Sequence, residues 1–378
     1  MIDPHQPVSG SDADGEATDQ APSPSGQPAR KRREALSTLR RTSPANSTRP
    51  PTIYDVARAA GVSHQTVTRY LKGFEGIRPD TKERVRKALK QLDYRPNLTA
   101  RSLTTGQSRR IGMLTHEAGQ YGPSKIMQGA TDAARAAGYL LDIVALDLGS
   151  PESISEALDL LQQHDLAGIL AMASTDEMAR AFESTQFSVP VFMGNEPDDA
   201  TRSKASELTA VGFPALVGHL YGLGHRRFMH VAGPATWSAA RNRLRAVKAA
   251  LAEHGLEPAC VILGDWSARS GYEAVKALHT DIGATAIIAA NDQMALGAML
   301  ALTETGLRVP DDVSVTGVDD IPDAAFFRPP LTTLHVDFAA QGRAAVAELL
   351  GQISGTPPEE TIALRAELIV RQSTGPVA

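Results

Sequence analysis

Residues 52–71 have the sequence TIYDVARAAGVSHQTVTRYL, which predicts two short helices joined by a tight turn. Thr52 is a candidate N-cap, and Asp55 lies three residues later, where it can close a capping box. Apolar residues then recur at helical spacing until Gly61, which is expected to end the first helix. This stretch therefore begins with a short capped helix and a sharp turn.

The second helix of this stretch is expected to start after Ser63 and to bury Val67 and Leu71. Its other face carries side chains that can reach base edges and phosphates: His64, Gln65, Thr66, Thr68 and Arg69. A helix, a glycine-bearing turn and a polar second helix are typical of a helix-turn-helix. The alternative is an ordinary helical hairpin with a solvated polar face.

The charges of the chain are segregated along the sequence. The net charge is -5, but residues 49–110 carry 14 Lys and Arg against 5 Asp and Glu. Residues 111–378 carry 18 against 32, and the first 48 residues carry 6 of each sign. A basic small domain joined to an acidic large one indicates a polyanionic partner for the small domain only.

Length and composition restrict the class of protein. A chain of 378 residues suits two or three domains. Its single cysteine, Cys260, excludes a disulfide framework and a cysteine-based zinc site. No apolar run approaches the ~18 residues of a membrane span, and no hydrophobic signal core is present. We therefore expect a soluble, cytoplasmic protein without a membrane partner.

The segments beside the helix-turn-helix differ in composition. Residues 1–48 are rich in Pro, Ser, Asp, Gly and Gln and are predicted to form a disordered tail. A third helix from about Asp80 to Leu92 would complete a DNA-binding domain at 49–95. Residues 96–109 contain a short amphipathic stretch, which is a marginal helix in isolation. This stretch is either a hinge helix that orders against a partner or a simple linker.

From residue 110 onward, apolar strands alternate with helices. We expect strands at 111–115, 140–147, 168–173, 189–195, 226–234, 260–265, 284–292, 313–320, 331–337 and 362–370. This alternation is typical of parallel sheets covered by helices on both faces, and the length of 110–378 suits two doubly wound lobes. The fold class is therefore α/β, with ligands expected at the carboxyl ends of strands, in the cleft between lobes.

Polar and aromatic residues gather just after the predicted strands. They are Asn195, Glu196, Trp237, Arg241, Arg243, Asp265, Trp266, Asn291, Asp292, Asp319 and Asp320. Planar polar groups can bind sugar hydroxyls while an indole covers the apolar face of a sugar ring. Some of these residues have a structural alternative: Asp292 as a helix N-cap, Asp320 as a framework residue and Trp237 in loop packing.

Taken together, these motifs resemble the LacI/GalR family of sugar-responsive bacterial repressors, and especially its lactose-repressor-like members. The likeness covers about 52–374. It rests on TIYDVARAAGVSHQTVTRYL, KERVRKALKQLDYRPN, ARSL, GDWSA, ANDQMALGAM, GLRVPDDVSVTGVDD and PPLTTL. The resemblance implies a three-helix headpiece, a hinge helix and a two-lobed core like that of periplasmic binding proteins.

The resemblance also assigns DNA contacts. It implies that His64, Gln65 and Arg69 read operator bases, while Leu103 and Ala100 belong to a hinge helix whose leucine enters the minor groove. Further positions would hold the DNA: Thr52, Tyr54, Ser63, Thr68, Tyr94 and Asn97. The implied partners are double-stranded operator DNA with a palindromic sequence and a second copy of the chain, giving a homodimer.

The same resemblance assigns an effector site. Arg243, Asn291 and Asp319 match sugar-hydroxyl ligands, Trp266 matches the stacking position, and Ile126 matches an apolar contact. Gly194 stands where lactose-type repressors have a sugar-binding aspartate, and Asn195 or Glu196 could take its place. The implied effector is a small-molecule sugar, such as a galactoside or another glycoside.

An enzyme on a doubly wound fold is the main alternative. The sequence contains no GxGxxG after the first strand, no GxxxxGK[ST] and no GxSxG elbow. His116 with Glu117, and His225, could act as acid–base residues, but such histidines are more often loop or capping residues. We therefore expect no catalysis, no cofactor and no metal ion. A pure sugar-binding protein would have no use for the basic headpiece, and activation in place of repression stays open.

Overall fold

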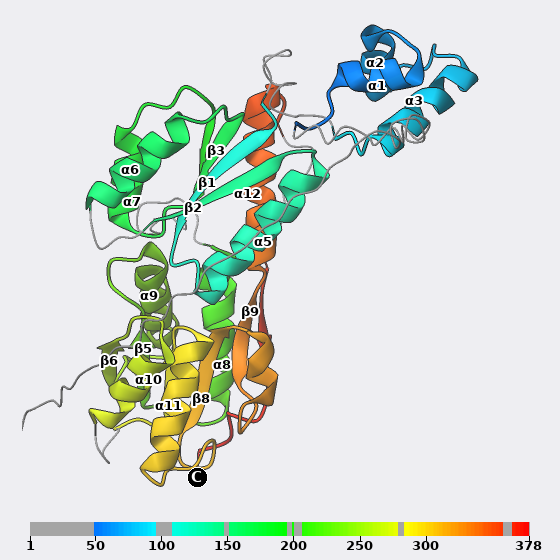
Figure 1. Cartoon of the computed structure of the whole chain (residues 1–378). Coiled ribbons are helices and arrows are strands. Elements are labelled where there is room, and N and C mark those ends of the chain that lie inside the picture. The colour runs from blue at the N-terminus through cyan, green and yellow to red at the C-terminus, as the bar shows by residue number, and fades with distance from the viewer. Residues whose placement is uncertain are drawn as a thin grey trace, which may run out of the picture. The chain divides into compact units, whose positions relative to one another are not determined.

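A computed structural model describes residues 49–95, 108–146, 151–194, 199, 206–278, 283–357 and 365–377 (Figure 1). The chain separates into two compact units, Met1–Arg95 and Pro96–Ala378, and each is described by itself. The predicted tail at 1–48 and most of the predicted hinge at 96–109 lie outside the described residues.

The first unit contains the three predicted helices: α1 (Ile53–Ala60), α2 (His64–Leu71) and α3 (Pro79–Gln91). At the start of α1, the Asp55 carboxylate accepts hydrogen bonds from the backbone N–H of Thr52 at 2.9 Å and from its hydroxyl at 2.7 Å. Gly61 ends α1 with a φ of 62°, in the left-handed region that glycine tolerates. The predicted caps are therefore confirmed.

A small apolar core holds these three helices together. Its buried members are Val56, Ala57, Ala60, Val67, Val85 and Ala88, and Leu71 packs against them half-buried. The Ser63 hydroxyl accepts the Thr66 N–H at 3.2 Å and so caps α2. Because α2 buries few side chains, most of its surface remains available for a partner.

The second unit begins with a lobe, here called the N-lobe, built on a four-stranded parallel sheet of order β2-β1-β3-β4. Its strands are β1 (Arg110–His116), β2 (Leu140–Leu146), β3 (Gly168–Ala171) and β4 (Val191–Met193). The helices that follow them in sequence are α5 (Tyr121–Ala136), α6 (Pro151–Gln162) and α7 (Asp176–Ser184). The central strands β1 and β3 are buried almost throughout, as expected for parallel strands between two helical layers.

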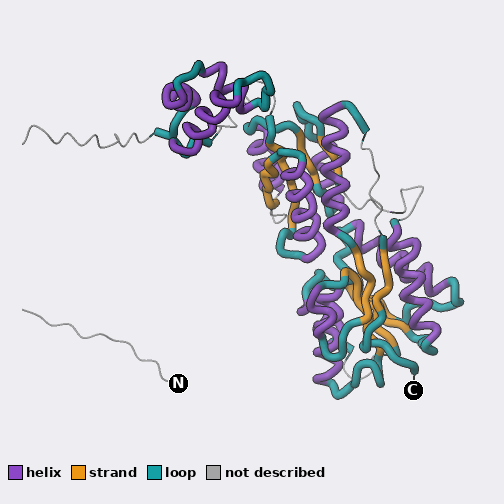
Figure 2. The backbone as a smooth tube through the Cα atoms, turned by 90° about the vertical axis from the view of Figure 1, so that its right-hand side faces the viewer, coloured by secondary structure: helices purple, strands orange, loops and turns teal. Residues whose placement is uncertain are grey.

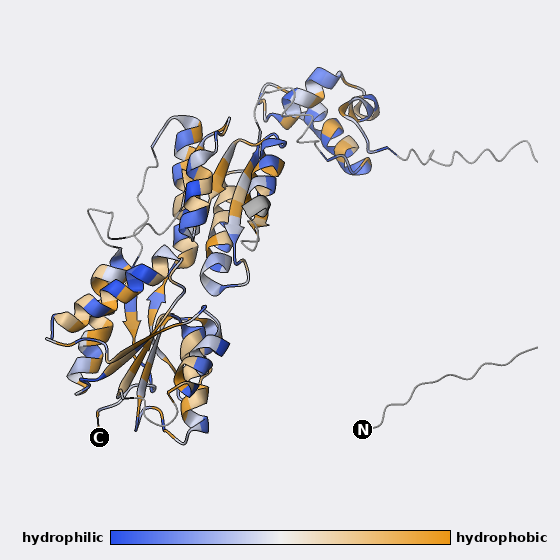
Figure 3. Ribbon diagram, turned by 90° about the vertical axis from the view of Figure 1, so that its left-hand side faces the viewer, coloured by the Kyte–Doolittle hydropathy of each residue, from blue (hydrophilic) through white to orange (hydrophobic). Residues whose placement is uncertain are grey.

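The other lobe, the C-lobe, has a six-stranded sheet of order β10-β9-β8-β7-β5-β6 (Figure 2). Its strands are β5 (Phe228–Ala232), β6 (Cys260–Leu263), β7 (Ala286–Ala289), β8 (Ser314–Asp319), β9 (Thr332–Val336) and β10 (Ala366–Ile369). Its helical segments are η2 (Leu208–Gly212), α8 (Phe213–Gly222), α9 (Ser238–Ala252), α10 (Ala268–Lys276), α11 (Asp292–Glu304) and η3 (Pro322–Phe326). In Figure 3, orange apolar residues occur along these strands and also on the helices beside them.

One strand departs from the prediction of wholly parallel sheets, because β10 pairs with β9 in the antiparallel direction. Between them runs α12 (Phe338–Ser354), which starts after the C-lobe strand β9 and packs against β3 and β4 of the N-lobe. The chain therefore returns from the N-lobe and enters the edge of the C-lobe sheet from the opposite end.

Helix α12 packs on α5 (Figure 1), and this packing depends on two glycines. A Cβ atom at Gly342 would collide with the carbonyl oxygen of Ile126, and one at Gly129 would collide with that of Ala339. The two helices thus approach at backbone distance. Since α5 and α12 both line the cleft described below, this crossing sets the shape of its wall.

The described segments include no helix with both the length and the apolar character that a membrane span needs. They also contain no group of three or more His, Cys, Asp or Glu side chains arranged to hold a metal ion.

Candidate functional site

The exposed face of α2 brings together most of the residues predicted to read DNA. His64, Gln65 and Arg69 are exposed, and Tyr54 from α1 lies beside them with its ring 5.2 Å from that of His64. The Arg69 guanidinium lies 5.6 Å from the centroid of the Phe74 ring, a weak cation–π contact that leaves its N–H groups able to bind a base or phosphate. This face offers several hydrogen-bonding groups from two helices.

The other predicted DNA contacts are placed less directly. The Thr68 hydroxyl donates to the His64 carbonyl at 2.9 Å, and the Thr52 hydroxyl donates to Asp55, so both groups already have partners within the headpiece. Tyr94 is half-buried against the headpiece core. Its ring therefore stabilises the headpiece, in addition to any contact that it makes with DNA. The remaining predicted contacts, Asn97, Ala100 and Leu103, lie outside the described residues.

In the second unit, a cavity of about 710 Å³ lies between the N-lobe and the C-lobe. Its C-lobe wall holds residues from just after the strands, as the sequence predicts: Trp237, Arg243, Trp266, Asn291 and Asp319. Its N-lobe wall includes Thr115, Met172, Ser174, Phe192 and Gly194 at the ends of β1, β3 and β4. Ile126 of α5 and Phe338 of α12 complete the apolar side.

Arg243 and Asp319 form the charged centre of this cleft. Their side chains are only 6% and 7% exposed, and Arg243 Nη1 lies 3.4 Å from Asp319 Oδ1. The same Nη1 donates to the carbonyl of Ala290, while Nε of Arg243 has no hydrogen-bond partner within the described part of the chain. Asp319 has a φ of 113°, a strained conformation for a residue with a side chain. The pair is electrically balanced and has donor capacity left for a neutral polar ligand.

Asn291 has a structural role in addition to its place in the cleft. Its Oδ1 accepts the Met294 N–H at 2.9 Å and so caps α11, and its Nδ2 donates to the Trp266 carbonyl at 2.9 Å. Asn291 therefore fixes Trp266, and it retains one N–H for a ligand.

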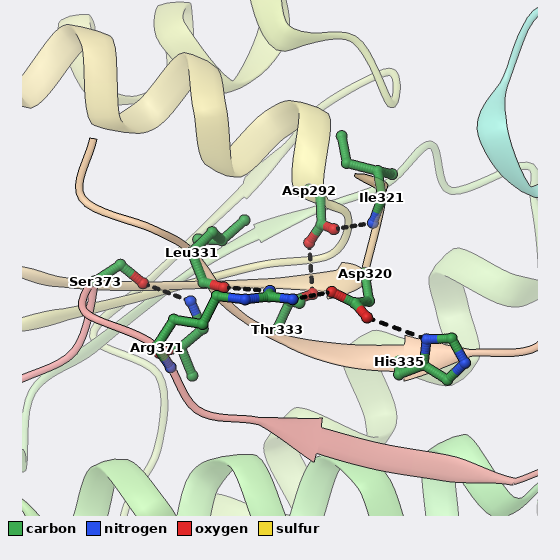
Figure 4. Close-up of polar contacts among 9 residues, drawn as sticks. Asp292, Asp320, Ile321, Leu331, Thr333, His335, Arg371 and Ser373 are labelled. Carbon is green, nitrogen blue, oxygen red and sulfur yellow. Dashed lines mark hydrogen bonds and ion pairs between the residues drawn. The ribbon is translucent and has the colours of Figure 1, made fainter. Parts of the chain in front are cut away.

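Asp292 is not the N-cap that the sequence suggested, because Asn291 takes that position. The Asp292 carboxylate instead accepts the Ile321 N–H at 2.8 Å and the Thr333 hydroxyl at 2.5 Å (Figure 4). Burial raises the pKa of Asp292 well above its usual range, and the charge of Asp319 acts in the same direction. Asp292 thus joins α11 to the loop that follows β8.

Asp320 is a framework residue, as predicted. Its two oxygens bind Arg371 Nη2 at 2.7 Å and His335 Nδ1 at 3.2 Å (Figure 4). These bonds hold the backbone immediately after Asp319, so Asp320 orients its neighbour.

Trp266 and Trp237 form an aromatic corner in the cleft. Their ring centroids are 5.6 Å apart with planes at 69°, and the Arg243 guanidinium lies 5.3 Å from the Trp266 ring. Gly233 is required beside them because a Cβ atom there would meet the outer edge of the Trp266 indole. Trp237 therefore lines the cleft, and loop packing alone does not describe it.

Comparison with known proteins identifies the family. The model for bacterial regulatory proteins of the lacI family matches residues 52–97, and that for a periplasmic binding protein-like domain matches residues 217–374. The lactose operon repressor of Escherichia coli (strain K12) is 34% identical over 328 residues, which are 86% of this chain and 91% of that protein. The chain belongs to the LacI family. It is a DNA-binding transcriptional repressor.

Other relatives agree with this membership. The transcriptional repressor PurR of Haemophilus influenzae (strain ATCC 51907 / DSM 11121 / KW20 / Rd) is 34% identical over 85% of this chain and 98% of its own length. A crystal structure of the lac repressor bound to ONPG matches with a TM-score of 0.77 at 34% identity, over 86% of this chain and all of that one. A complex of the regulator CelR with cellobiose matches with a TM-score of 0.62 at 28% identity, over 85% of this chain and 99% of that one.

Gly194, where the resemblance implies an aspartate in lactose-type repressors, lies in the N-lobe wall of the cleft. A Cβ atom there would lie 2.6 Å from Met172 Sδ and 3.4 Å from the Phe192 ring, so these side chains fill the space that a larger residue would need. Asn195 and Glu196, the two predicted substitutes, both lie outside the described residues. The described part of this wall is therefore mainly apolar.

The two histidines considered as acid–base residues occupy other environments in this LacI-family fold. His225 is buried, with Nδ1 3.0 Å from the Thr285 hydroxyl and Nε2 3.0 Å from that of Ser314. His116 ends β1 and is neither a loop nor a capping residue; burial lowers its pKa to about 4. Its ring lies 4.7 Å from Trp237, and neither ring nitrogen has a hydrogen-bond partner in the described segments.

Several cleft residues were missing from the prediction: Thr115, Tyr121, Ser174, Ser238, Phe338 and Gln341. Thr115 and Ser174 lie near the ends of β1 and β3, so the strand-end rule used for the C-lobe could have found them. Phe338 and Gln341 had no such signal, because their position depends on where α12 crosses between the lobes.

Proposed function

We propose that this LacI-family repressor binds a palindromic operator as a homodimer and is released by a neutral sugar, such as a galactoside or another glycoside. The observation that carries the proposal is the group of Arg243, Asp319, Asn291 and Trp266 at one end of the cleft. An ion pair and an amide can bind adjacent hydroxyls, and an indole can cover the apolar face of a pyranose.

The charge balance of the cleft supports a neutral effector. Arg243, the buried cation, is paired with Asp319. The other charged residues that line the cleft are Glu207, Glu348 and Arg365, so an anionic ligand would meet more carboxylates than cations. The apolar N-lobe wall, with Met172 and Phe192, suits the less polar part of a glycoside. Among related proteins, a lac repressor structure contains ONPG and a CelR structure contains cellobiose.

Exposed apolar side chains support the homodimer. Leu296 and Leu300 project from α11 into solvent, and Phe326 of η3 is 84% exposed. In the N-lobe, Leu140 and Ile143 are exposed on β2, which is one of the two edge strands of the described sheet. Such groups on a single chain mark surfaces that a second subunit can cover. One related structure is of a lac repressor dimer bound to operator.

The repressor assignment leaves no catalytic step to explain, and we propose that the protein is not an enzyme. Its relatives are transcriptional repressors. His225 is bonded to the Thr285 hydroxyl inside the C-lobe, and His116 lies against the indole of Trp237. Neither contact is one that acid–base catalysis would need. We also propose that it acts in the cytoplasm, where its DNA is found.

Arg69→Ala is expected to weaken binding to the selected operator by 10- to 100-fold. A bidentate contact from arginine to a base contributes about 1–3 kcal/mol of discrimination, and the Arg69 side chain is exposed on α2 for that purpose. Fluorescence anisotropy with a labelled duplex measures the change. Arg69→Lys is the matched control, since it keeps the charge, and should retain non-specific DNA affinity while losing most specificity. Wild-type operator affinity in both variants would remove Arg69 from the recognition surface.

Operator binding and sugar binding should differ in their dependence on salt. Operator affinity is expected to fall on the order of 10³-fold between 50 and 200 mM salt, because a protein gripping several phosphates releases counterions. Sugar affinity should stay constant over the same range, because a neutral ligand releases none. A flat salt dependence of operator binding would contradict phosphate contacts by the basic headpiece.

The test of the function as a whole uses an operator selected from random palindromic duplexes. Mono- and disaccharides, including cellobiose and ONPG, are then titrated into the protein–DNA complex while anisotropy is recorded. One sugar should release the DNA at micromolar to millimolar concentration. If the protein enriches no duplex from the random pool, operator binding is contradicted. If it enriches a duplex but no sugar releases that DNA, the proposed effector is contradicted.

A further inference from the structure

Three aromatic side chains, here called the aromatic row, run from the N-lobe into the effector cleft. His116 lies at the end of β1 in the N-lobe, and its ring centroid is 4.7 Å from that of Trp237. Trp237 precedes α9 in the C-lobe, and its centroid is 5.6 Å from that of Trp266. The middle member therefore touches both the opposite lobe and the stacking residue of the effector site.

Two further contacts hold the Trp237 segment to the N-lobe. Trp237 forms an isolated antiparallel β-bridge with Thr175, which caps α7. On the first turn of α9, Arg241 Nη2 binds Asp176 Oδ1 at 2.8 Å. The backbone, the ring and the following helix turn are thus all attached to the N-lobe on one side of the cleft.

Trp266 has little open surface in this arrangement. The residue is 7% exposed, with the Arg243 guanidinium 5.3 Å and the Trp237 ring 5.6 Å from its ring. A sugar ring that stacks on an indole needs one face of it free. Of these two neighbours, Arg243 is held in place by Asp319 and by the Ala290 carbonyl. A stacking ligand is therefore expected to take the space that the Trp237 ring now holds.

We propose that Trp237 is the positioning residue that couples the effector to the lobes: a sugar that stacks on Trp266 displaces the Trp237 ring and loosens its contacts with His116, Thr175 and Asp176. This inference rests on the proposed sugar site. It gives the site a mechanical connection to the N-lobe that does not pass through α12.

Linkage sets the direction of the effect. Contacts present only in the conformation that excludes the sugar oppose sugar binding, and a ligand shifts an equilibrium by its differential affinity for the two states. Removing the Arg241–Asp176 contact should therefore tighten sugar binding and, because coupling is reciprocal, weaken operator binding.

The first test measures tryptophan fluorescence and needs no ligand. Trp237 and Trp266 are the two tryptophans of the chain, so replacing one leaves the other as the only source of the signal. Trp237→Phe and Trp237→Ala both leave Trp266 as the sole tryptophan. Acrylamide should quench Trp266 weakly in the Phe variant and at least threefold more strongly in the Ala variant, where the covering ring is lost. Equal quenching in the two folded variants would overturn the proposal. Should the Ala variant fail to fold, Trp266→Phe decides: Trp237 must be shielded from acrylamide, and free quenching of it overturns the proposal.

The second test uses the full-length protein, its selected operator, and ONPG and cellobiose as probes. Asp176→Asn should bind the active sugar threefold to tenfold more tightly and the operator correspondingly more weakly. Glu177→Gln is the matched control, because Glu177 is the next exposed carboxylate of α7 and should change neither affinity. Unchanged affinities in Asp176→Asn would overturn the coupling. If no sugar binds the wild type, the proposed effector fails, while the quenching result still decides whether Trp237 covers Trp266.

Discussion

Gly342→Ala is expected to lower the free energy of unfolding of the effector-binding unit by about 3 kcal/mol. The reason is the crossing of α12 over α5, where an added Cβ atom at Gly342 would collide with the Ile126 carbonyl oxygen. A backbone atom cannot move aside as the end of a side chain can, so the helices would have to separate. Their separation would open the packing around Ala130 and Val346, which are buried between them.

Chemical denaturation followed by circular dichroism measures this effect. Gly218→Ala is the matched control, because Gly218 lies inside α8 and an added Cβ atom there meets nothing within 4 Å. That control should be stabilised by roughly 0.5–1 kcal/mol, since alanine favours the helix over glycine. Equal stability of the Gly342→Ala and wild-type proteins would show that the two helices do not cross at backbone distance.

The sequence was sufficient to predict the headpiece and the strand order along the chain. The periodicity of α1 and α2 together with Thr52, Gly61 and Ser63 located both helices to within a residue or two. The buried runs at β1, β3 and β7 are short and apolar on both faces, which is the pattern of a central parallel strand. Caps and strand patterns of this kind depend on residues that are adjacent in the sequence, so they can be recognised without the structure.

The cleft was predictable mainly on its C-lobe side, and on the N-lobe side the resemblance predicted Ile126, which lines it. The polar residues after β5, β6, β7 and β8 converge in the C-lobe because the carboxyl ends of parallel strands share one edge of the sheet. The roles of Asn291 and Asp292 were not separable in the sequence, because both are good caps and only the start of α11 decides between them. The direction of β10 and the approach of Phe338 depend on the crossing of α12, which is a long-range feature.

Trp237 shows most clearly what sequence reasoning leaves open. Its position after a strand was compatible with a ligand contact or with loop packing. The structure gives it contacts with both lobes, through His116 and Thr175 on one side and Trp266 on the other. Contacts between the two lobes depend on how far the cleft is closed. The residues next to Trp237 in the sequence give no indication of that closure.

Asp319→Asn is expected to reduce sugar affinity about 100-fold while operator affinity in the absence of sugar stays at the wild-type level. A hydrogen bond to a buried charged group contributes about 1.5–3 kcal/mol, and the two carboxylate oxygens can accept from adjacent hydroxyls. Asparagine keeps the shape of the side chain but loses the charge and one acceptor. The headpiece is a separate compact unit, so its own contacts with DNA do not involve Asp319.

The choice of asparagine over alanine follows from Arg243. The Arg243 side chain is 6% exposed and is paired with Asp319. Both substitutions remove the counter-charge, but asparagine keeps an oxygen that can accept from Arg243, whereas alanine would also remove that acceptor and confuse lost binding with lost stability. Asp311→Asn is the control, because Asp311 is exposed and its pair with Arg308 contributes little. Sugar titration of the operator complex and thermal unfolding are measured on all three proteins. If the sugar releases the Asp319→Asn protein from the operator at the wild-type concentration, Asp319 is excluded from the effector site. If the sugar no longer releases this protein and its unfolding temperature is unchanged, Asp319 contacts the sugar directly.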